Sequence, residues 1–193
     1  MLVWLRQEVQ EVPRRLTAPD PQLQDDLIRL EPLDLAHLTE LLELAEDPDV
    51  VRFTRVPADA DETFARGWIR RYQGGWQDGT SAGFAIRGHD AGFVGFAGVV
   101  DLDLEHREGE IGYMVTPSAR GRGIAPRAVE LLTSWGFDEL GLIRLELRID
   151  VENPASERVA ARTGYLREGV MRNVHFKEGL RCDLAVWSRL RED

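Results

Sequence analysis

The sequence predicts a mixed α/β (α+β) domain in which strands and helices alternate around one sheet. Residues 144–151 alternate strictly between apolar and charged side chains, as in a strand with one covered face. Ala128, Leu131, Leu132 and Trp135 instead recur at helical spacing. With 193 residues, of which 43% are hydrophobic, the chain is long enough to form one domain with a sizeable core.

The first half of the chain predicts two helices and three strands. The segment Glu46-Asp47-Pro48-Asp49 is expected to end the first helix, and Gly74, Gly75 and Gly79 to break the second. The two strands that follow are joined by a short glycine-containing segment, which predicts a hairpin. In order, the expected elements are a strand over 27–30, a helix over 35–45, a helix over 63–73, and strands over 81–87 and 93–102.

The second half repeats a strand, a turn and a helix twice. An apolar run over 110–115 leads through a glycine-rich turn into a helix that begins near Ala125. The strand over 144–151 leads into a second helix, for which Asn153 is the expected cap and Gly164 the left-handed stop. Two further strands are expected to close the sheet, over 164–172 and 181–190.

The first of these turns predicts an anion site. Its glycines let backbone N–H groups converge, and the unpaired N–H groups of the first helical turn add the positive end of the helix dipole. Pro126 suits that first turn because the N–H it lacks has no partner there. No Lys-Ser or Lys-Thr follows the glycines, and their spacing does not fit GxGxxG, so the common nucleotide-binding loops are excluded.

Two motifs resemble one enzyme family. The pattern Arg-x-x-Gly-x-Ala, made by Arg120, Gly123 and Ala125, resembles the acyl-CoA pyrophosphate loop of the GNAT acyltransferases. The segment 153–165 resembles the Asn-x-x-Ser-x-x-Val-x-x-x-x-Gly-Phe signature of the RimJ/RimL branch of that family. The resemblance extends over residues 26–190 and implies the GNAT fold, a central, mostly antiparallel mixed sheet whose middle strands splay apart between flanking helices.

The resemblance also implies how acetyl-CoA, the expected co-substrate, is held. Asn153 would bond the pantetheine amides as well as cap its helix, although a capping role alone remains open. Arg122 is equally able to point into solvent. The implied contacts are the loop Gly121, Arg122, Gly123, Ile124 and Ala125 on the pyrophosphate, main-chain groups of Met114 and Val115 on pantetheine, and the side chains of Arg120, Arg122 and Arg162 on CoA phosphates.

Three residues are candidates for proton transfer. By resemblance to RimJ/RimL enzymes, Ser156 lies beside the CoA sulfur and is the general acid that protonates the leaving thiolate. A serine that merely satisfies a first-turn backbone group is the alternative. The base is either Glu110, at the start of the splayed strand, or His175, which stands where some relatives carry glutamate. A solvated strand-edge charge and a structural histidine remain the alternatives.

The function implied is transfer of an acetyl group from acetyl-CoA to a primary amine in a ternary complex. The acceptor is a protein N-terminus or a small-molecule amine such as an antibiotic. A succinyl group remains open in place of the acetyl group. A non-catalytic acyl-CoA-binding module is the third hypothesis. The net charge of −10 argues against nucleic-acid binding and mildly favours a cationic acceptor.

Composition sets further expectations. No apolar run is long enough to span a bilayer, and the first residues lack the pattern of a secretory signal, so we expect a cytoplasmic protein without a membrane partner. Cys182 is the single cysteine and the four histidines lack ligand spacing, so no metal is expected.

Residues 1–25 are expected to form an extension before a single domain over 26–193. Trp4 and its apolar neighbours favour either a homodimer contact or an intramolecular strand.

Overall fold

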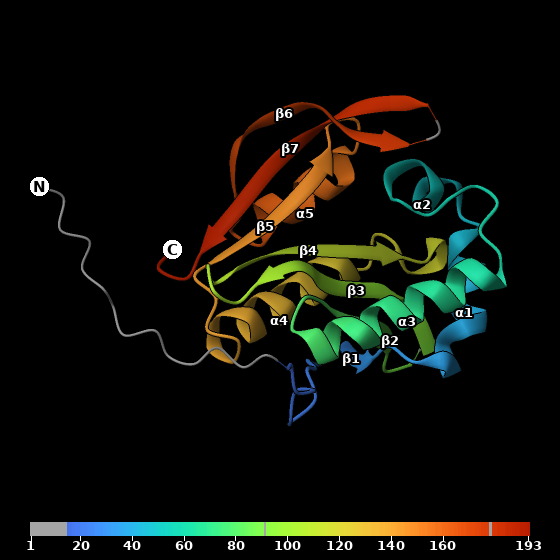
Figure 1. Ribbon diagram of the computed structural model, residues 1–193, viewed down its shortest axis with the longest axis horizontal. Coiled ribbons are helices and arrows are strands. Elements are labelled where there is room, and N and C mark those ends of the chain that lie inside the picture. The colour runs from blue at the N-terminus through green and yellow to red at the C-terminus, as the bar shows by residue number, and fades with distance from the viewer. Residues whose placement is uncertain (1–14, 91, 178) are drawn as a thin grey trace, which may run out of the picture.

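The computed structural model describes residues 15–90, 92–177 and 179–193 and arranges them as one sheet between two groups of helices (Figure 1). The expected alternation of strands and helices is confirmed. The elements are β1 (Ile28–Pro32), η1 (Leu35–His37), α1 (Leu38–Ala45), α2 (Pro48–Phe53), α3 (Glu62–Asp78), β2 (Ala82–Gly88), β3 (Gly92–Asp103), β4 (Glu108–Val115), η2 (Pro117–Ala119), α4 (Ile124–Asp138), β5 (Arg144–Asp150), α5 (Pro154–Arg162), β6 (Leu166–Lys177) and β7 (Leu180–Leu190).

The seven described strands lie in the order β1-β2-β3-β4-β5-β7-β6. Neighbours are antiparallel except for β4 and β5, which are parallel, so the predicted mixed and mostly antiparallel sheet is confirmed. The parallel pairing covers only three residue pairs and ends where Glu110 lies opposite Glu146. Beyond that pair the two strands separate, as Figure 1 shows, and the predicted splay is confirmed.

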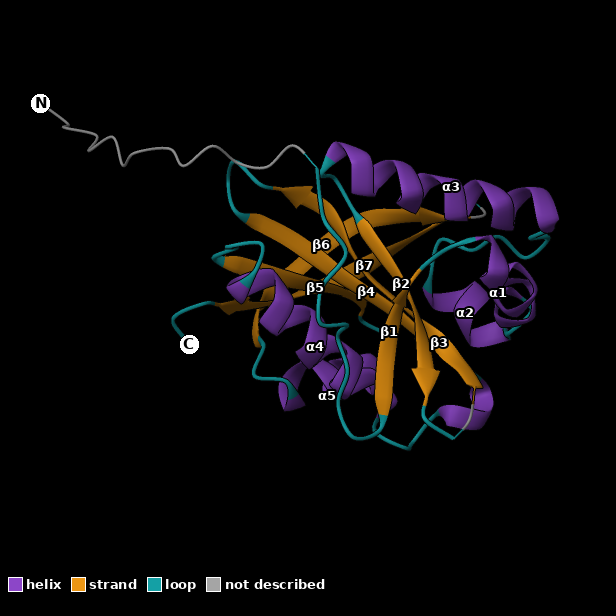
Figure 2. Cartoon of the chain, turned by 90° about the horizontal axis from the view of Figure 1, so that it is seen from below, coloured by secondary structure: helices purple, strands orange, loops and turns teal. Residues whose placement is uncertain are grey.

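Both faces of the sheet are covered, with α1, α2 and α3 on one side and α4 and α5 on the other (Figure 2). Strand β2 therefore has apolar side chains on both faces. Phe84 and Ile86 pack into the larger core, whereas Ala85 between them packs into the second core with Phe96 and Tyr72. A strand covered on both faces has no polar side to display, which explains its nearly continuous apolar run.

The structure differs from the sequence prediction in the α1 to α3 region. Residues 46–49 do end α1, but Asp47 also begins α2, because its carboxylate accepts from the N–H groups of Asp49 and Val50 and Pro48 occupies the first turn. The prediction that Gly74 and Gly75 break the next helix is wrong, since α3 continues to Asp78. Gly79, in the left-handed conformation at φ 72°, ends it.

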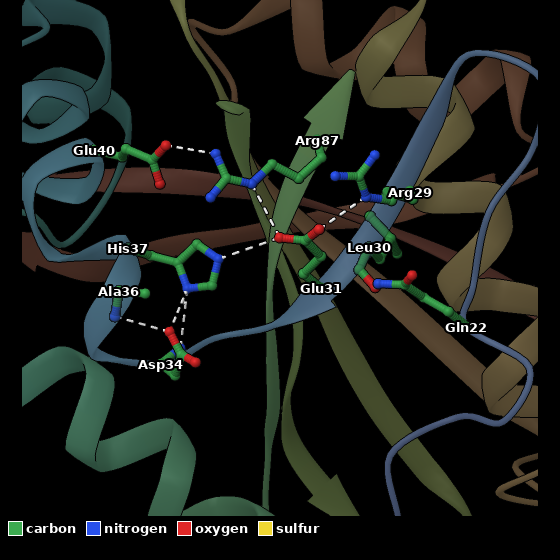
Figure 3. Close-up of polar contacts among 9 residues, drawn as sticks. All are labelled: Gln22, Arg29, Leu30, Glu31, Asp34, Ala36, His37, Glu40 and Arg87. Carbon is green, nitrogen blue, oxygen red and sulfur yellow. Dashed lines mark hydrogen bonds and ion pairs between the residues drawn. The ribbon is translucent and has the colours of Figure 1, made fainter. Parts of the chain in front are cut away.

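The junction between β1 and α1 is fixed by a half-buried polar cluster (Figure 3). Glu31 accepts from Arg29 and Arg87, and the ring of the buried His37 lies 3.5 Å from the same carboxylate. Arg87 also donates to Glu40 on α1, so a single guanidinium joins β2, the end of β1 and the first helix. This cluster holds α1 against the sheet and with it the helical layer that contains α2 and α3.

The segment before β1 packs on the domain. Leu16 is 5% exposed within the larger core, and its N–H donates to the carbonyl of Trp76 at 2.9 Å. A domain boundary at residue 26 stays a prediction, although the contacts of Leu16 tie residues ahead of that boundary to the folded core. Trp4 and its apolar neighbours, on which the homodimer hypothesis depends, lie outside the described residues.

Candidate active site

A cleft of about 1540 Å³ opens where β4 and β5 separate. One wall consists of β4 and the turn before α4, and a second consists of the end of β5 and the start of α5. Helices α2 and α3 line the remaining side. Ser156, Glu110 and His175 all line this single cleft, so the structure brings the three predicted proton-transfer residues together.

The glycine-rich turn has the geometry expected of an anion site. Gly121 and Gly123 have φ values of 73° and 81°, a conformation that L residues adopt at a cost, and Gly123 directly precedes α4. No side chain among the described residues caps α4, and a Cβ built on either glycine would meet no atom within 4 Å. The N–H groups of Ile124 and Ala125 therefore start a helix beside open space, where an anion is stabilised.

The register of β4 decides which main-chain groups face the cleft. The N–H of Thr116 donates to the carbonyl of Val94, so these opposite residues form a hydrogen-bonded pair of the β3 and β4 ladder. Alternation along the ladder then turns the main-chain groups of Met114 toward β3 and those of Tyr113 and Val115 toward the open edge. The main-chain contacts predicted for Met114 and Val115 stay predictions, and the register turns only Val115 of the two, together with Tyr113, toward the open edge.

Asn153 and Ser156 occupy the first turn of α5. The Asn153 side chain accepts from the N–H of Ser156 at 3.1 Å, which confirms the predicted cap. The side-chain N–H₂ of Asn153 remains available for a second contact in the cleft that this residue lines. Ser156 is half-buried in the same wall, with its hydroxyl beside β4.

Tyr113 is a site residue that the sequence analysis did not single out. Burial raises the pKa of its hydroxyl to about 12, with a smaller opposing contribution from the hydroxyl of Ser156. The hydroxyl is shielded from solvent and faces Ser156 without a well-aligned hydrogen bond to any described residue. A buried hydroxyl in this state is costly, so Tyr113 is a polar group of the cleft wall that a further hydrogen-bond partner would stabilise.

Glu110 stands at the point where β4 and β5 part. Its side chain is 19% exposed, and burial raises its pKa from 4.5 to about 7. Arg148, whose Nε lies 3.4 Å from Oε2, opposes the shift, and the charge of Asp101 adds to it. A carboxyl group with a pKa near neutrality exchanges a proton readily at physiological pH, which is the property required of a general base.

His175 lies on β6, opposite Cys182 on β7, and reaches the same cleft. The sequence prediction stopped the first of the two closing strands at 172, whereas β6 continues to Lys177 and β7 begins at Leu180. This longer hairpin brings the half-buried imidazole of His175 to the cleft wall. Both candidate bases therefore line the same cleft.

The predicted phosphate-binding arginines have different surroundings. Arg120 donates to Asp47 at 2.6 Å and to Asp49 at 2.9 Å, so its guanidinium joins the turn before α4 to α2. Arg122 is exposed and lies outside the cleft lining. Arg162 lines the cleft from the last turn of α5, and Arg158, one helical turn earlier, does so too. Arg158 and Arg162 are four residues apart and therefore share one face of α5, so this spacing could have identified Arg158 from the sequence.

The Arg120 ion pairs have an electrostatic consequence on α2. Burial would raise the pKa of Asp47, but the hydrogen bond from Arg120 and those from the N–H groups of Val50 and Asp49 hold it below its usual value. Asp47 is thus a charged cap, and its position depends on the turn that carries the anion site. In this way the turn before α4 supports α2 across the cleft.

Two absences concern residues 15–90, 92–177 and 179–193. No helix among them combines the length and apolar character that crossing a membrane requires. No three of their histidine, cysteine, aspartate and glutamate side chains gather in a way that would hold a metal ion.

The sequence matches the family model of the acetyltransferase (GNAT) domain over residues 28–166. The Bacillus subtilis (strain 168) protein named "Putative ribosomal N-acetyltransferase YdaF" is 31% identical over 169 residues, which cover 85% of this chain and 90% of the relative. Among solved structures, RimL, a ribosomal-protein α-N-acetyltransferase in complex with coenzyme A, superimposes with a TM-score of 0.79 at 20% identity and covers 88% of this chain and 97% of its own.

The spermidine N-acetyltransferase of Vibrio cholerae, in complex with CoA and spermine, superimposes with a TM-score of 0.76 at 18% identity, covering 87% of this chain and 98% of its own. These two structures support the fold, and the family model and YdaF support the family. The splayed strands, the glycine-rich turn before α4 and the matched domain lead to one conclusion: the chain belongs to the GNAT family of acetyl-CoA-dependent N-acetyltransferases.

Proposed function

We propose that Glu110 and Ser156 carry out proton transfer for this N-acetyltransferase while an acetyl group passes directly from acetyl-CoA to a primary amine. The separation of β4 from β5 carries the proposal, because it creates the cleft with Glu110 at its closed end and Ser156 on its wall. The amine nitrogen forms the new C–N bond as the C–S bond breaks, giving an amide and the free thiol of CoA.

The residues of the cleft fit acetyl-CoA in three places. The N–H groups of Ile124 and Ala125 begin α4 without a side-chain cap and suit the pyrophosphate. Main-chain groups of Tyr113 and the N–H of Val115 face the open edge of β4 and suit the pantetheine amides, with Asn153 on the opposite wall. The carbonyl of Val115 already accepts from Nε of Arg120 at 3.2 Å. Arg158 and Arg162 supply positive charge along α5 for the remaining phosphate. Acetyl-CoA supplies the activated acyl group.

Glu110 acts as the base. Since its pKa is about 7, a large share of the molecules carry the carboxylate at neutral pH. The proton accepted from the ammonium of an acceptor, directly or through one water molecule, leaves the nitrogen lone pair free to attack. Arg148 moderates the basicity of Glu110, and Asp101 adds negative charge that favours a cationic amine at this end of the cleft.

Ser156 acts as the general acid. Its hydroxyl gives a proton to the sulfur that leaves, and Tyr113 faces the same hydroxyl from β4. Because its pKa is about 12, Tyr113 stays neutral and can donate a hydrogen bond to the Ser156 oxygen as negative charge develops there. The second proton that the nitrogen loses as the amide forms restores the Ser156 hydroxyl through water, and Glu110 gives its proton to bulk solvent after the products leave.

The acceptor that we propose is the α-amine of a peptide or protein. YdaF is named for a ribosomal substrate and RimL acts on a ribosomal protein, whereas the Vibrio cholerae relative was solved with spermine. An α-amine has a pKa of about 8 and demands less of a base than the amines of pKa about 10 found in lysine and polyamines. A base whose pKa is about 7 is therefore better matched to an α-amine. We place the reaction in the cytoplasm.

Initial rates of CoA thiol release, measured with a set of N-terminal peptides, lysine derivatives and spermidine, test this function. We expect turnover with peptide α-amines that is lost in Glu110→Gln and in Ser156→Ala. Turnover of peptides at the wild-type rate in both variants would refute the assigned roles, and turnover of spermidine alone would refute the acceptor.

A further inference from the structure

Two arginines on α3, Arg70 and Arg71, line the cleft without an acidic partner among the described residues, and both are exposed. Arg55, between α2 and α3, also lines the cleft, but its charge acts on Glu110 and lowers the pKa of that carboxyl. Two other arginines on this side of the cleft are paired, since Arg52 donates to Glu152 at 2.9 Å and Arg120 is bound by two aspartates. Unneutralised guanidinium groups at the edge of a cleft are donors ready for an anion.

Acidic and basic side chains line different parts of the cleft. Glu110 lies opposite Val100 in the β3 and β4 ladder, and Asp101 follows directly, so two carboxylates stand at the closed end. The Arg71 guanidinium lies 5.4 Å from the ring centroid of Tyr72, on the helix that faces those strands. Asp78 also lines the cleft, but it is seven residues beyond Arg71, about 10 Å along the helix axis.

An aromatic surface lies between the two charged regions. The rings of Trp68 and Tyr72 each pack against Phe96 with centroids 5.1 Å apart. Phe96 lies opposite Met114 in the β3 and β4 ladder, so this surface supports the cleft beside β4. A ligand that lies across it has its cationic end near Glu110 and its other end near the arginines of α3.

We propose that the acceptor carries a carboxylate close to its reactive amine, and that Arg70 and Arg71 bind this anionic group. The inference rests on the proposed function, since it assigns the acceptor of the same site. It predicts peptides with acidic residues next to the N-terminus as better acceptors than neutral peptides. It predicts polyamines as poor acceptors, because their additional cations would meet two guanidinium groups.

The test compares two amidated tetrapeptides, Ser-Asp-Asp-Ala and Ser-Asn-Asn-Ala, at saturating acetyl-CoA, with spermidine as a third acceptor. The two peptides have the same size and amine, so a difference in KM reports the side-chain charge. We expect a KM about tenfold lower for the acidic peptide at low ionic strength, a smaller ratio in 0.5 M salt, and similar kcat for both peptides.

The variant Arg70→Gln/Arg71→Gln should remove most of the KM difference. The matched control is Arg66→Gln on the same helix, where Arg66 pairs with Glu62 and lies outside the cleft lining; it should retain the difference. An unchanged KM for acetyl-CoA in each variant shows that the cleft is intact.

Equal KM values for the two peptides in the wild type, or a difference that survives in the double variant, would overturn the inference while leaving the transferase function in place. A spermidine KM below that of both peptides would also overturn it. If no amine is acetylated although acetyl-CoA binds, the proposed function fails, and the assignment of an acceptor fails with it.

Discussion

Replacing Glu110 with glutamine should remove activity and increase stability in the same variant. Burial raises the pKa of Glu110 from 4.5 to about 7, although Arg148 lies 3.4 Å away. A shift of this size corresponds to about 3 kcal/mol of preference for the protonated form in the folded protein. Glutamine keeps the size of the side chain and has no charge to bury.

The direction of the pH effect follows from linkage. The folded protein binds the proton of Glu110 more tightly than the unfolded chain does, so stability declines as pH rises from 4.5 to about 7 and then stays lower. The Glu110→Gln variant lacks this decline. We expect its free energy of unfolding at pH 8 to exceed that of the wild type by up to about 3 kcal/mol, and the gain to vanish near pH 4.

Activity should change in the opposite direction. With saturating acceptor, kcat of the wild type should rise with pH and level off above about 7, as the carboxylate forms. Glu110→Gln should lower kcat by about 10²–10⁴-fold and remove this limb. Urea denaturation and thiol-release rates, each measured from pH 4 to 9, provide both profiles. Glu108→Gln is the matched control, because Glu108 is an exposed residue of the same strand.

A kcat profile of the wild type that levels off near pH 4.5 would refute the reasoning about burial. A Glu110→Gln variant that retains full kcat would refute the role as base. A variant that is less stable than the wild type at pH 8 would show that the Arg148 ion pair outweighs the cost of burial.

Three further predictions concern neighbouring parts of the structure. Ser156→Ala should lower kcat by about 10²–10⁴-fold and leave the Kd for acetyl-CoA unchanged in calorimetry, whereas an equal loss of binding would contradict its role as acid. Arg120→Gln should reduce stability at pH 7 by about 1–2 kcal/mol, a loss that diminishes in urea titrations as pH falls below 3.8 and the partner Asp47, whose pKa is lowered, becomes protonated. Gly83→Ala should cost about 1–3 kcal/mol in denaturant unfolding, because its Cβ would lie 2.6 Å from Cγ of Tyr72; an unchanged midpoint would show that this ring moves aside freely.

Periodicity and end signals were sufficient for most of the fold. The strict alternation of 144–151 and the Asn153 cap predicted β5 and α5 closely, because both signals are local and recur in the structure. The glycine-rich turn was equally informative, since the left-handed Gly121 and Gly123 are where the sequence predicted a helix start. Local chemistry decides these features, and tertiary contacts do not override it.

The sequence predictions were wrong at residues whose role is decided by tertiary packing and not by local backbone conformation. Gly75 was interpreted as a helix breaker, but a Cβ there would lie 1.9 Å from Oγ of Ser81, so the glycine permits a close approach within an unbroken helix. Asp47-Pro48 was interpreted as a stop, although the same pair is a cap and first-turn proline for α2. Both sequences are compatible with either role, and the three-dimensional surroundings decide between them.

The sequence indicated Ser156 and Glu110 as candidate site residues, and both line the cleft. Which main-chain groups of β4 face the open edge could not be predicted, because only the hydrogen bond from Thr116 to Val94 shows that those of Tyr113 do and those of Met114 do not. The pairing of Arg120 with α2 joins residues more than seventy positions apart, and no local pattern reports such a contact.

Acetyl-CoA binding at the turn before α4 is the central claim, and isothermal calorimetry tests it most directly. The pair Gly123→Asn and Gly123→Asp isolates charge, because both side chains tolerate the left-handed conformation and differ only in the carboxylate. We predict micromolar binding to the wild type, binding within about tenfold of that for Gly123→Asn, and loss of binding for Gly123→Asp. A wild-type protein that binds no acyl-CoA, or equal affinity in the two variants, would contradict the assignment of this turn as the pyrophosphate site.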